Sequence, residues 1–283
     1  MRRTLGPPIV VGVNGTAEST LALHWAVVEA RLRHRPLHVV SAYHLSDPGA
    51  MAPPPTAPIL RSPPPKIREA HERALEYARN HLDVEDVSGE LAPGGAAPAL
   101  RRAAESAELL VVGARERMTR HSVSHAVAAH ASSPTVVVRP RNSEPSRTIV
   151  AALDGSERSE RAATFAFEEA KLRGATVEVV HYWVPIGPDP GYKEWVERVG
   201  LDLREQVYES VAALRTKYPA VATRELVLEG HPAEELAARS ASADLVVVGS
   251  RGHGRFVGAL LGSVSQSLLG RAHGPIVVVK DRI

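Results

Sequence analysis

The sequence contains no cysteine, few aromatic residues and no long apolar run, and each absence excludes a class of protein. Without cysteine, there can be no disulfides, thiol catalysis or thiolate metal sites. No run approaches the length of a membrane span, and only a short apolar stretch follows Met1-Arg2-Arg3, unlike the core of a signal peptide. We therefore expect a cytoplasmic protein without a membrane partner.

An excess of charge of one sign is also missing. The 283 residues carry a formal net charge of +2, basic residues are scattered among acidic ones, and only 4% of the residues are aromatic. A nucleic-acid-binding protein typically has a basic patch, so we expect no nucleic-acid partner. The apolar share of 44% is ordinary for a globular protein, and a chain of this length favours two domains.

Three segments of the first half recur in the second half in the same order. Residues 9–16 resemble 149–156, residues 109–115 resemble 245–251, and residues 134–139 resemble 275–280. Self-similarity at a fixed offset indicates a duplicated domain. We place the first domain at 1–141, a polar linker at 142–147 and the second domain at 148–283.

Strand and helix patterns alternate within each half. In the second half we expect strands at about 148–154, 176–182, 224–228, 244–249 and 276–280, and helices at about 157–172, 192–216, 232–241 and 257–270. The strands are mostly apolar, as parallel strands covered on both faces require. The pattern predicts an α/β fold with an open parallel sheet and right-handed crossovers in each domain.

A proline-rich segment at 47–65 interrupts the first domain. Proline at this density favours extended, solvated backbone and does not join a helix or an inner strand. We interpret the segment as an insertion between the second strand and the second helix. A docking segment for an aromatic-lined groove of a protein partner is the alternative.

The most informative stretch lies near the C-terminus. A buried strand at 245–248 is followed by Gly249, Gly252, Gly262 and Ser263, with the spacing G-x2-G-x9-G-S. Glycines and exposed backbone N–H groups beside a helix form an anion cradle, and a phosphate is the usual anion there. The stretch matches neither the Walker pattern nor the dinucleotide G-x-G-x-x-G pattern. The alternative is that these glycines serve only as turn residues and a helix cap.

This spacing closely resembles the ATP-binding signature of the universal stress protein family, and the resemblance covers essentially the whole chain. It implies two tandem open-sheet, Rossmann-like domains, similar to adenine nucleotide hydrolases, with parallel strand order 3-2-1-4-5. Ligands bind outside the carboxyl ends of the first and fourth strands in that order. The resemblance therefore implies that ATP, with Mg²⁺ held mainly by phosphates and water, occupies the second domain and acts in regulation or sensing during a stress response.

The resemblance assigns ligand contacts in the second domain. Asp154 follows the first strand, where a carboxylate suits ribose hydroxyls, but a helix cap or an Asx turn would use it equally well. The other candidate binding residues are Gly249, Gly252, Gly262, Ser263 and Ser265 at the phosphate end with Val264 beside them, and Ala152, Val180 and Val248 around the adenine. Arg251, His253 and Arg255 could add positive charge or could simply be solvated.

The first domain departs from this pattern. Asn14 stands where Asp154 does, Glu116 where Gly252 does, Ala126 where Gly262 does, and Val127 where Ser263 does. A glutamate beside phosphate oxygens is a like-charge contact that costs about 1–4 kcal/mol. That is a large share of the roughly 8 kcal/mol behind micromolar binding. We predict that the first domain binds ATP poorly or not at all.

No catalytic constellation stands out in the sequence. His121 and His125 share a helix face, but no glutamate completes an H-E-x-x-H metal motif, and we expect a solvated surface. We assign no general base and find no dedicated lysine over the phosphates, so slow ATP hydrolysis is the most that we expect. The alternatives to an ATP-binding regulator are a slow adenine-nucleotide hydrolase and a nucleotide-independent scaffold that acts through protein contacts.

The last strand of each domain, at 135–139 and 276–280, is short and apolar and is expected at a sheet edge. An exposed edge can pair with another strand. The resemblance implies that such strands pair the two domains, and we expect further self-association into a homodimer.

Overall fold

The computed structural model describes residues 6–43, 62–115, 119, 122–140, 146–184, 192–251 and 261–280, with backbone only for 192–197. Gly252, Glu116, His121, His253 and Arg255 lie outside these ranges, as do most of the proline-rich segment 47–65 and most of the linker 142–147. The chain forms two compact units, one built on residues up to Val138 and the other on residues from Arg139 onward.

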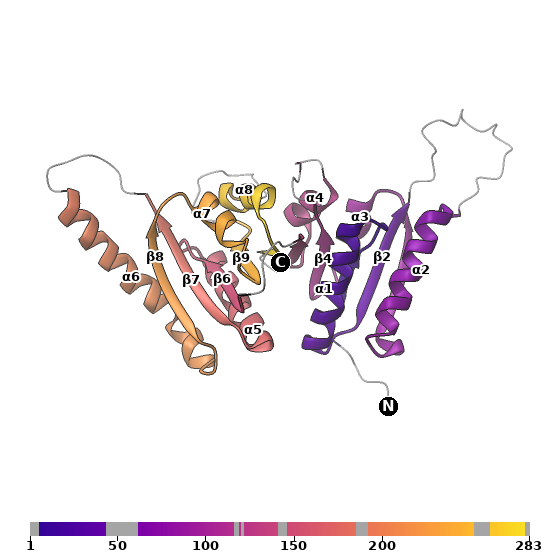
Figure 1. Ribbon diagram of the computed structural model, residues 1–283, viewed down its shortest axis with the longest axis horizontal. Helices are drawn as coiled ribbons and strands as arrows, with labels where there is room; N and C mark the ends of the chain where they lie inside the picture. Colours follow the sequence, from indigo (N-terminus) through magenta and orange to yellow (C-terminus); the bar gives the residue numbers. More distant parts are fainter. Residues whose placement is uncertain are drawn as a thin grey trace. The chain divides into compact units, whose positions relative to one another are not determined.

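Each unit repeats the order strand–helix–strand (Figure 1). The first unit consists of β1 (Ile9–Gly12), α1 (Ala17–Arg33), β2 (Leu37–Tyr43), α2 (Pro65–Arg79), the 3₁₀ turn η1 (Val84–Asp86), β3 (Val87–Pro93), α3 (Ala96–Ala104), β4 (Leu109–Gly113), α4 (Val123–His130) and β5 (Thr135–Val138). The second unit consists of β6 (Thr148–Ala152), α5 (Glu157–Arg173), β7 (Thr176–Trp183), α6 (Tyr192–Lys217), β8 (Thr223–Glu229), α7 (Pro232–Arg239), β9 (Leu245–Gly249), α8 (Ser263–Arg271) and β10 (Ile276–Val279).

The strand order in each unit is the expected 3-2-1-4-5. In the first unit the order is β3-β2-β1-β4-β5, and in the second it is β8-β7-β6-β9-β10, with parallel pairs throughout. In the second unit, Ala151 of β6 is in register with Val179 on one side and with Val247 on the other. The carboxyl ends of β6, β7 and β9 therefore meet at one edge of the sheet.

The apolar strands form the core because helices cover both faces of the sheet. Ile149, Leu245 and Ile276 are fully buried. Helix α5 packs on β6 and β9, and α6 packs on α5 and β8. Because the chain reverses direction across the sheet after β8, right-handed crossovers place α7 and α8 on the opposite face, where they pack against each other.

Local sequence explains where α5 begins and ends. The Ser156 hydroxyl accepts a hydrogen bond from Ser159 N at 3.3 Å and so caps the first turn, while Gly174 ends the helix in the left-handed region at φ 61°. Glycine adopts that conformation without the Cβ penalty of other residues. The bend that joins β6 to α5 is therefore fixed by residues next to the expected site.

Two expected boundaries are wrong. The sequence pattern predicts a helix over 257–270, whereas α8 begins at Ser263, and Gly262 is its extended N-cap at φ −69° and ψ 160°. Glycine inside a helix costs about 1 kcal/mol relative to alanine, which favours the cap position. The first strand of the second unit ends at Ala152 instead of residue 154, because Asp154 and Gly155 form a turn in which Gly155 has φ 81°.

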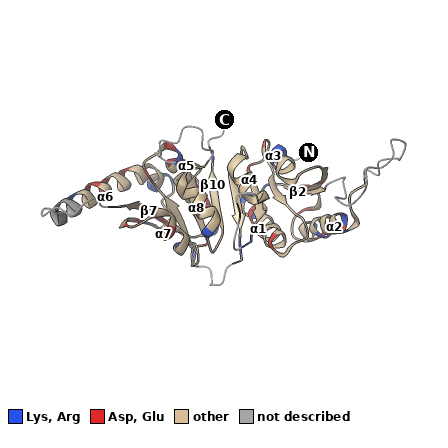
Figure 2. Ribbon diagram, turned by 90° about the horizontal axis from the view of Figure 1, so that it is seen from above, with Lys and Arg blue, Asp and Glu red and all other residues tan. Residues whose placement is uncertain are grey.

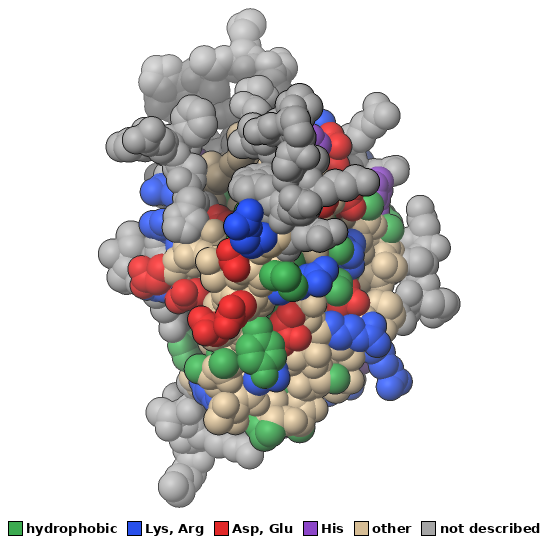
Figure 3. All heavy atoms as spheres, turned by 90° about the vertical axis from the view of Figure 1, so that its left-hand side faces the viewer, with side chains coloured by type: hydrophobic (Ala, Val, Ile, Leu, Met, Phe, Trp, Pro, Cys, Tyr) green, Lys and Arg blue, Asp and Glu red, His purple; other side chains and the backbone are tan. Residues whose placement is uncertain are grey.

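Charges on the helices alternate in sign, and many are paired. Arg161 lies 2.6 Å from Glu157 and Arg173 lies 2.7 Å from Glu169, both within α5. Basic and acidic segments also alternate along the described part of α6 (Figure 2). The face drawn in Figure 3 accordingly mixes acidic, basic and apolar side chains. In the ranges that the structure describes, no helix has the length and apolarity needed to cross a membrane.

Candidate functional site

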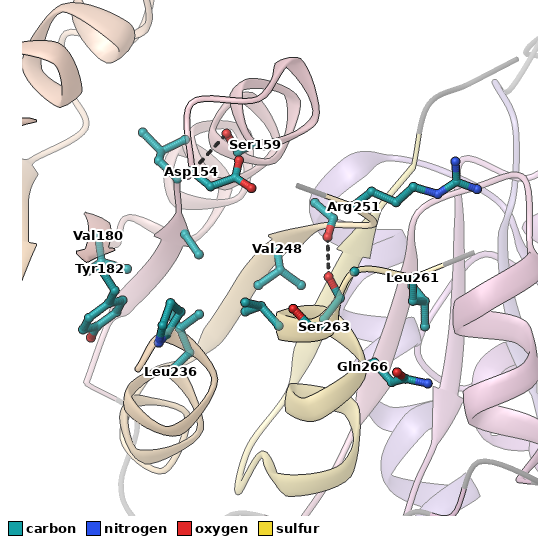
Figure 4. Close-up of a pocket in the computed structure, with 17 residues that line it drawn as sticks. Asp154, Ser159, Val180, Tyr182, Leu236, Val248, Arg251, Leu261, Ser263 and Gln266 are labelled. Carbon is teal, nitrogen blue, oxygen red and sulfur yellow. Dashed lines mark hydrogen bonds between the residues drawn. The ribbon is translucent and has the colours of Figure 1, made fainter. Parts of the chain in front are cut away.

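A pocket of about 430 Å³ opens at the carboxyl ends of β6, β7 and β9 in the second unit (Figure 4). Helices α7 and α8 complete its wall. The position is the topological switch point, where successive crossovers lead to opposite faces of the sheet and leave a crevice between them. Its volume lies within the range of roughly 300–1,000 Å³ that is typical of small-molecule sites.

Most of the candidate residues predicted from the sequence lie in this one pocket. Its lining includes Ala152, Asp154, Val180, Val248, Gly249, Gly262, Ser263, Val264 and Ser265. Gly252, the remaining candidate, falls outside the described residues. In Figure 4, Asp154 and Ser263 flank the opening from opposite sides, with Val248 between them. Their contact with a ligand remains a prediction.

Asp154 lies in the tight turn between β6 and α5. Its Oδ1 accepts hydrogen bonds from Ser156 N at 3.0 Å and from Ser156 Oγ at 2.6 Å, which is an Asx turn. Its own backbone N–H donates to Ser159 Oγ at 3.3 Å. Asp154 therefore forms the Asx turn that the sequence offered as an alternative role, and Ser156 is the helix cap. The Asp154 side chain is nevertheless exposed at the rim, so the turn also presents its carboxylate to the pocket.

The N-terminus of α8 lines the pocket, and within the described ranges its N-cap residue makes no side-chain hydrogen bond to the first turn. Gly262 is the N-cap and has no side chain that could accept from the N–H groups of the first turn. Gly262 N itself donates to Ser250 O at 2.8 Å, which fixes the chain at the helix start. The first turn carries no acidic residue. Uncapped N–H groups and the helix dipole make such an end favourable for an anion.

Ser265 has a structural hydrogen bond that limits its part in binding. Its Oγ donates to Gly249 O at 2.6 Å, and the side chain is buried. The hydroxyl proton is thereby committed to the end of β9 and cannot also be donated to a ligand. Ser263, in contrast, is exposed at the first helical position. The two serines, which the sequence treats alike, have different environments.

Gly249 has a packing reason to be glycine, besides any ligand. A Cβ on Gly249 would lie 3.2 Å from the carbonyl carbon, Cβ and O of Arg158. That separation is tighter than ordinary van der Waals contact, so a side chain at the end of β9 would require the first turn of α5 to shift by a few tenths of an ångström. Gly249 therefore has a structural role in the close packing of β9 against α5, in addition to any contact with a ligand.

Several lining residues were not predicted from the sequence. They are Leu153, Ser159, Tyr182, Pro232, Leu236, Leu261 and Gln266. Most belong to elements other than the glycine motif and reach the pocket only through the fold. Tyr182 could have been predicted from the sequence, because it lies two residues beyond Val180 and therefore faces the same side of β7. Arg251 also lines the pocket, but Figure 4 shows its guanidinium extending away from Asp154 and Val180.

The peptide group of Tyr182 extends past the end of β6. Thr176 N donates to Arg147 O and Leu153 N donates to Val180 O, both at 2.9 Å, so the even-numbered residues of β7 direct their peptide groups toward β6. On the other edge, Gly230 N donates to Trp183 O at 3.0 Å. Since β6 ends at Ala152, the N–H and C=O of Tyr182 lie on the pocket side, beyond the last ladder bond.

The first unit repeats the turn but differs at the helix. Asn14 Oδ1 accepts from Thr16 N at 3.2 Å and from Thr16 Oγ1 at 2.9 Å, the same Asx turn without the charge. At α4, Ser122 is the N-cap and accepts from His125 N at 3.2 Å. The corresponding helix end of the first unit is thus closed by its own side chain.

The structure corrects the alignment of the two glycine–serine segments. Ser124 Oγ donates to Gly113 O at 2.6 Å, as Ser265 does to Gly249, but 11 residues separate the first pair and 16 the second. Ser263 therefore corresponds to Ser122, and Gly262 to His121. The correspondence of Ala126 with Gly262 and of Val127 with Ser263 is wrong, because the loop before α4 is shorter than the loop before α8.

Comparisons with known proteins agree with this architecture. Residues 7–139 and 145–280 each match the model of the universal stress protein family. A universal stress protein of Mycolicibacterium smegmatis is 34% identical over 288 residues, covering 97% of both chains, and universal stress protein Rv2623 of Mycobacterium tuberculosis is 31% identical over 294 residues, again covering 97% of both. A solved universal stress protein from Archaeoglobus fulgidus has a TM-score of 0.67 at 17% identity, covering 97% of this chain and 96% of that one. The chain therefore belongs to the universal stress protein family and carries two copies of its domain.

Proposed function

We propose that the second unit binds ATP in the pocket at the ends of β6, β7 and β9, and that this binding is a regulatory or sensing event in a stress response. The observation that carries the proposal is the uncapped N-terminus of α8 facing the same pocket as the exposed carboxylate of Asp154. An anion-binding end and a hydroxyl-binding end in one crevice suit a nucleotide.

The phosphates would lie at the start of α8. The N–H groups of Ser263, Val264 and Ser265 are those that the helix cannot satisfy internally. The exposed hydroxyl of Ser263 can add a donor, whereas Ser265 would contribute through its backbone. Mg²⁺ would be held mainly by phosphate oxygens and water, because Mg²⁺ retains much of its hydration shell in nucleotide sites.

The ribose and the base would lie toward β6 and β7. The Asp154 carboxylate is exposed in the lining of the pocket, where it can accept hydrogen bonds from ribose hydroxyls. Val180, Val248 and Leu236 provide apolar walls for a base. The neighbouring N–H and C=O of Tyr182 match an adenine edge, which offers an acceptor beside an amino donor.

Hydrolysis is at most slow in this proposal. The catalytic role has no assigned base, because Asp154 belongs to the ribose end and is engaged in the turn. Regulation by occupancy requires only that ATP binds the folded second unit.

The first test is titration calorimetry of MgATP into nucleotide-free protein, beside the variants Gly252→Glu and Gly200→Glu. Gly252→Glu copies the glutamate of the first unit, while Gly200 lies in α6 where an added Cβ meets open space. We expect one site per chain that is lost in Gly252→Glu and kept in Gly200→Glu. Two sites would contradict the degenerate first unit. An absence of binding by folded, nucleotide-free protein would favour the scaffold alternative.

Localisation and assembly are also part of the proposal. We propose a cytoplasmic protein that self-associates through its last strands, because β5 and β10 are short and apolar and the family resemblance implies pairing of such strands. Light scattering across a concentration series tests this. A mass equal to one chain at all concentrations would exclude the homodimer.

A further inference from the structure

Three side chains form a connected chain at the base end of the pocket. Arg239 Nε donates to Tyr182 Oη at 2.6 Å, and Arg239 Nη1 donates to Glu178 Oε2 at 3.0 Å. Arg224 lies 3.7 Å from the other oxygen of Glu178. Tyr182 and Glu178 both belong to β7, and Arg239 belongs to the last turn of α7. The tyrosine is thus tied to the helix that closes this side of the pocket.

This chain fixes the orientation of the Tyr182 ring. Only 9% of Tyr182 is exposed, and its two supports, the side chains of Arg239 and Glu178, are 30% and 16% exposed, so all three lie largely out of water. A tyrosine has two side-chain torsions, and a hydroxyl held at 2.6 Å restrains both. Burial, the largest cause, raises the pKa of Tyr182, so the phenol stays neutral and keeps its own proton for donation. In Figure 4 the ring lies beside Leu236 and Val180, away from the phosphate end.

The first unit lacks this arrangement. In the repeat, Val40 is equivalent to Val180, because each pairs with the last residue of the first strand of its unit. Ala42 is therefore equivalent to Tyr182, and His38 to Glu178. Gly94 N donates to Tyr43 O at 2.8 Å, as Gly230 N does to Trp183 O, so Gly94 and Gly230 are equivalent. Counting along α3 and α7 from these glycines makes Ala103 the equivalent of Arg239. The aromatic wall and both of its supports are therefore specific to the second unit.

The packing at the carboxyl end of the first strand also differs between the two units. In the first unit, a Cβ on Gly12 would lie 3.0 Å from a methyl carbon of Leu100, so this leucine packs over the end of β1. In the second unit the corresponding position is Ala152, whose Cβ occupies that point, and Leu236 lines an open pocket instead. Leu100 thus packs over the end of β1 in the first unit, whereas in the second unit Leu236 and the ring of Tyr182 line the pocket.

Resting on the proposed function, we propose that Tyr182 is the specificity-determining residue that contacts the base and limits the depth of the pocket, and that Arg239 and Glu178 are its positioning residues. The ligand class that this wall favours is a nucleotide with a planar base over a base-free polyphosphate. Contact with an aromatic ring is the kind of interaction that every flat heterocycle can make.

The test compares MgATP with inorganic tripolyphosphate as probes, by calorimetry, for the wild type and Tyr182→Ala, Tyr182→Phe and Arg239→Ala. Loss of an aromatic contact with a base lowers affinity about 10- to 100-fold in typical cases, and we expect this for MgATP with Tyr182→Ala. Tripolyphosphate binding should stay unchanged. Tyr182→Phe and Arg239→Ala should each weaken MgATP binding a few-fold, and their double variant should weaken it no further than one alone.

A second tyrosine–arginine pair provides the matched control. Arg215 Nη2 lies 3.0 Å from Tyr208 Oη on the exposed side of α6, away from the pocket. Tyr208→Ala should leave both probes unaffected. Equal weakening of MgATP and tripolyphosphate by Tyr182→Ala, or no change in either, would overturn the inference while leaving ATP binding intact. Failure of the folded wild type to bind MgATP would overturn the proposed function and this inference together.

Discussion

The Ser265 hydroxyl donates to the carbonyl oxygen of Gly249 at 2.6 Å and so joins the first turn of α8 to the end of β9. Ser124 makes the same bond to Gly113 in the first unit, also at 2.6 Å. Because both serines are buried, each bond satisfies a strand-end carbonyl that water does not easily reach. The bond that sets the helix position is common to both units, and the units differ in what surrounds the helix end.

Ser265→Ala should destabilise the protein, because it leaves the Gly249 carbonyl without this donor. We expect a loss of about 1–3 kcal/mol in the free energy of unfolding, measured by urea denaturation and circular dichroism. Ser263→Ala, at an exposed position, should change stability by less than about 0.5 kcal/mol and should instead weaken MgATP binding. The reverse assignment of effects would contradict the roles given to the two serines.

Asp154→Asn separates the turn from the charge. Asn14 makes the same Asx turn in the first unit, so asparagine should support this turn in the second. We expect stability within about 0.5 kcal/mol of the wild type. Affinity for MgATP should fall about tenfold, since hydrogen bonds to a charged acceptor are stronger than those to a neutral one. Unchanged affinity would confine Asp154 to its structural role.

The two strand-end glycines should tolerate alanine differently. A Cβ on Gly113 would fall far inside contact distance of the Glu18 carbonyl, a backbone group that cannot rotate away, whereas one on Gly249 would sit 3.2 Å from Arg158. We expect Gly249→Ala to cost about 1–3 kcal/mol, in the usual range for overpacking, and Gly113→Ala to cost more. Urea unfolding of both variants checks the order. Equal costs would contradict this order and would mean that α1 and α5 both move aside to accommodate the added Cβ.

His71 should make the first unit sensitive to acid. Its Nδ1 lies 3.0 Å from Ser41 Oγ, and burial, the largest cause, lowers the pKa of His71, with His38 and Arg79 acting in the same direction and Glu72 opposing. Because the folded-state pKa is below that of the unfolded chain, the unfolded state takes up the proton first. Stability is therefore full above the ordinary histidine pKa of about 6.5 and falls as the pH drops below it toward the folded-state pKa.

His71→Asn is the variant for this test, since its amide can keep a hydrogen bond to Ser41 but does not titrate. We expect a smaller loss of unfolding free energy between pH 7 and pH 5 than in the wild type. His38→Asn is the comparison, because burial also lowers the pKa of His38. If His71→Asn keeps the full slope, His71 is not the group responsible.

Much of the fold could be predicted from the sequence because its signals are local. Apolar runs such as 245–248 mark the strands, and the recurrence of three segments marks the duplication. The strand order came from the family resemblance, and the pairing confirms it. The start of α8 was placed too early, since the helical period continues upstream of Gly262 while the backbone at Gly262 is extended.

The site was harder to predict where several elements meet. Tyr182 and Leu236 lie on β7 and α7, far in sequence from the glycine motif, and only the sheet order brings them to the pocket. Arg239 of α7 reaches the site only through its hydrogen bond to Tyr182. The matching of Ala126 with Gly262 was wrong because a shortened loop shifts the register without altering the strands. Such a shift becomes evident only from a shared hydrogen bond, here that of Ser124 and Ser265.

The different caps of α4 and α8 have a thermodynamic consequence. Ser122 caps α4 with its own side chain, whereas Gly262 has no side chain with which to cap α8, and we propose that the phosphates of a ligand occupy this position. By linkage, a solute present at 100 times its dissociation constant adds about 2.7 kcal/mol to the unfolding free energy of the unit that binds it. Melting of the second unit would then track the concentration of its ligand, while melting of the first would not. Under the proposed function, the melting temperature of the first domain depends on its own sequence, whereas that of its duplicate also depends on the ligand concentration around it.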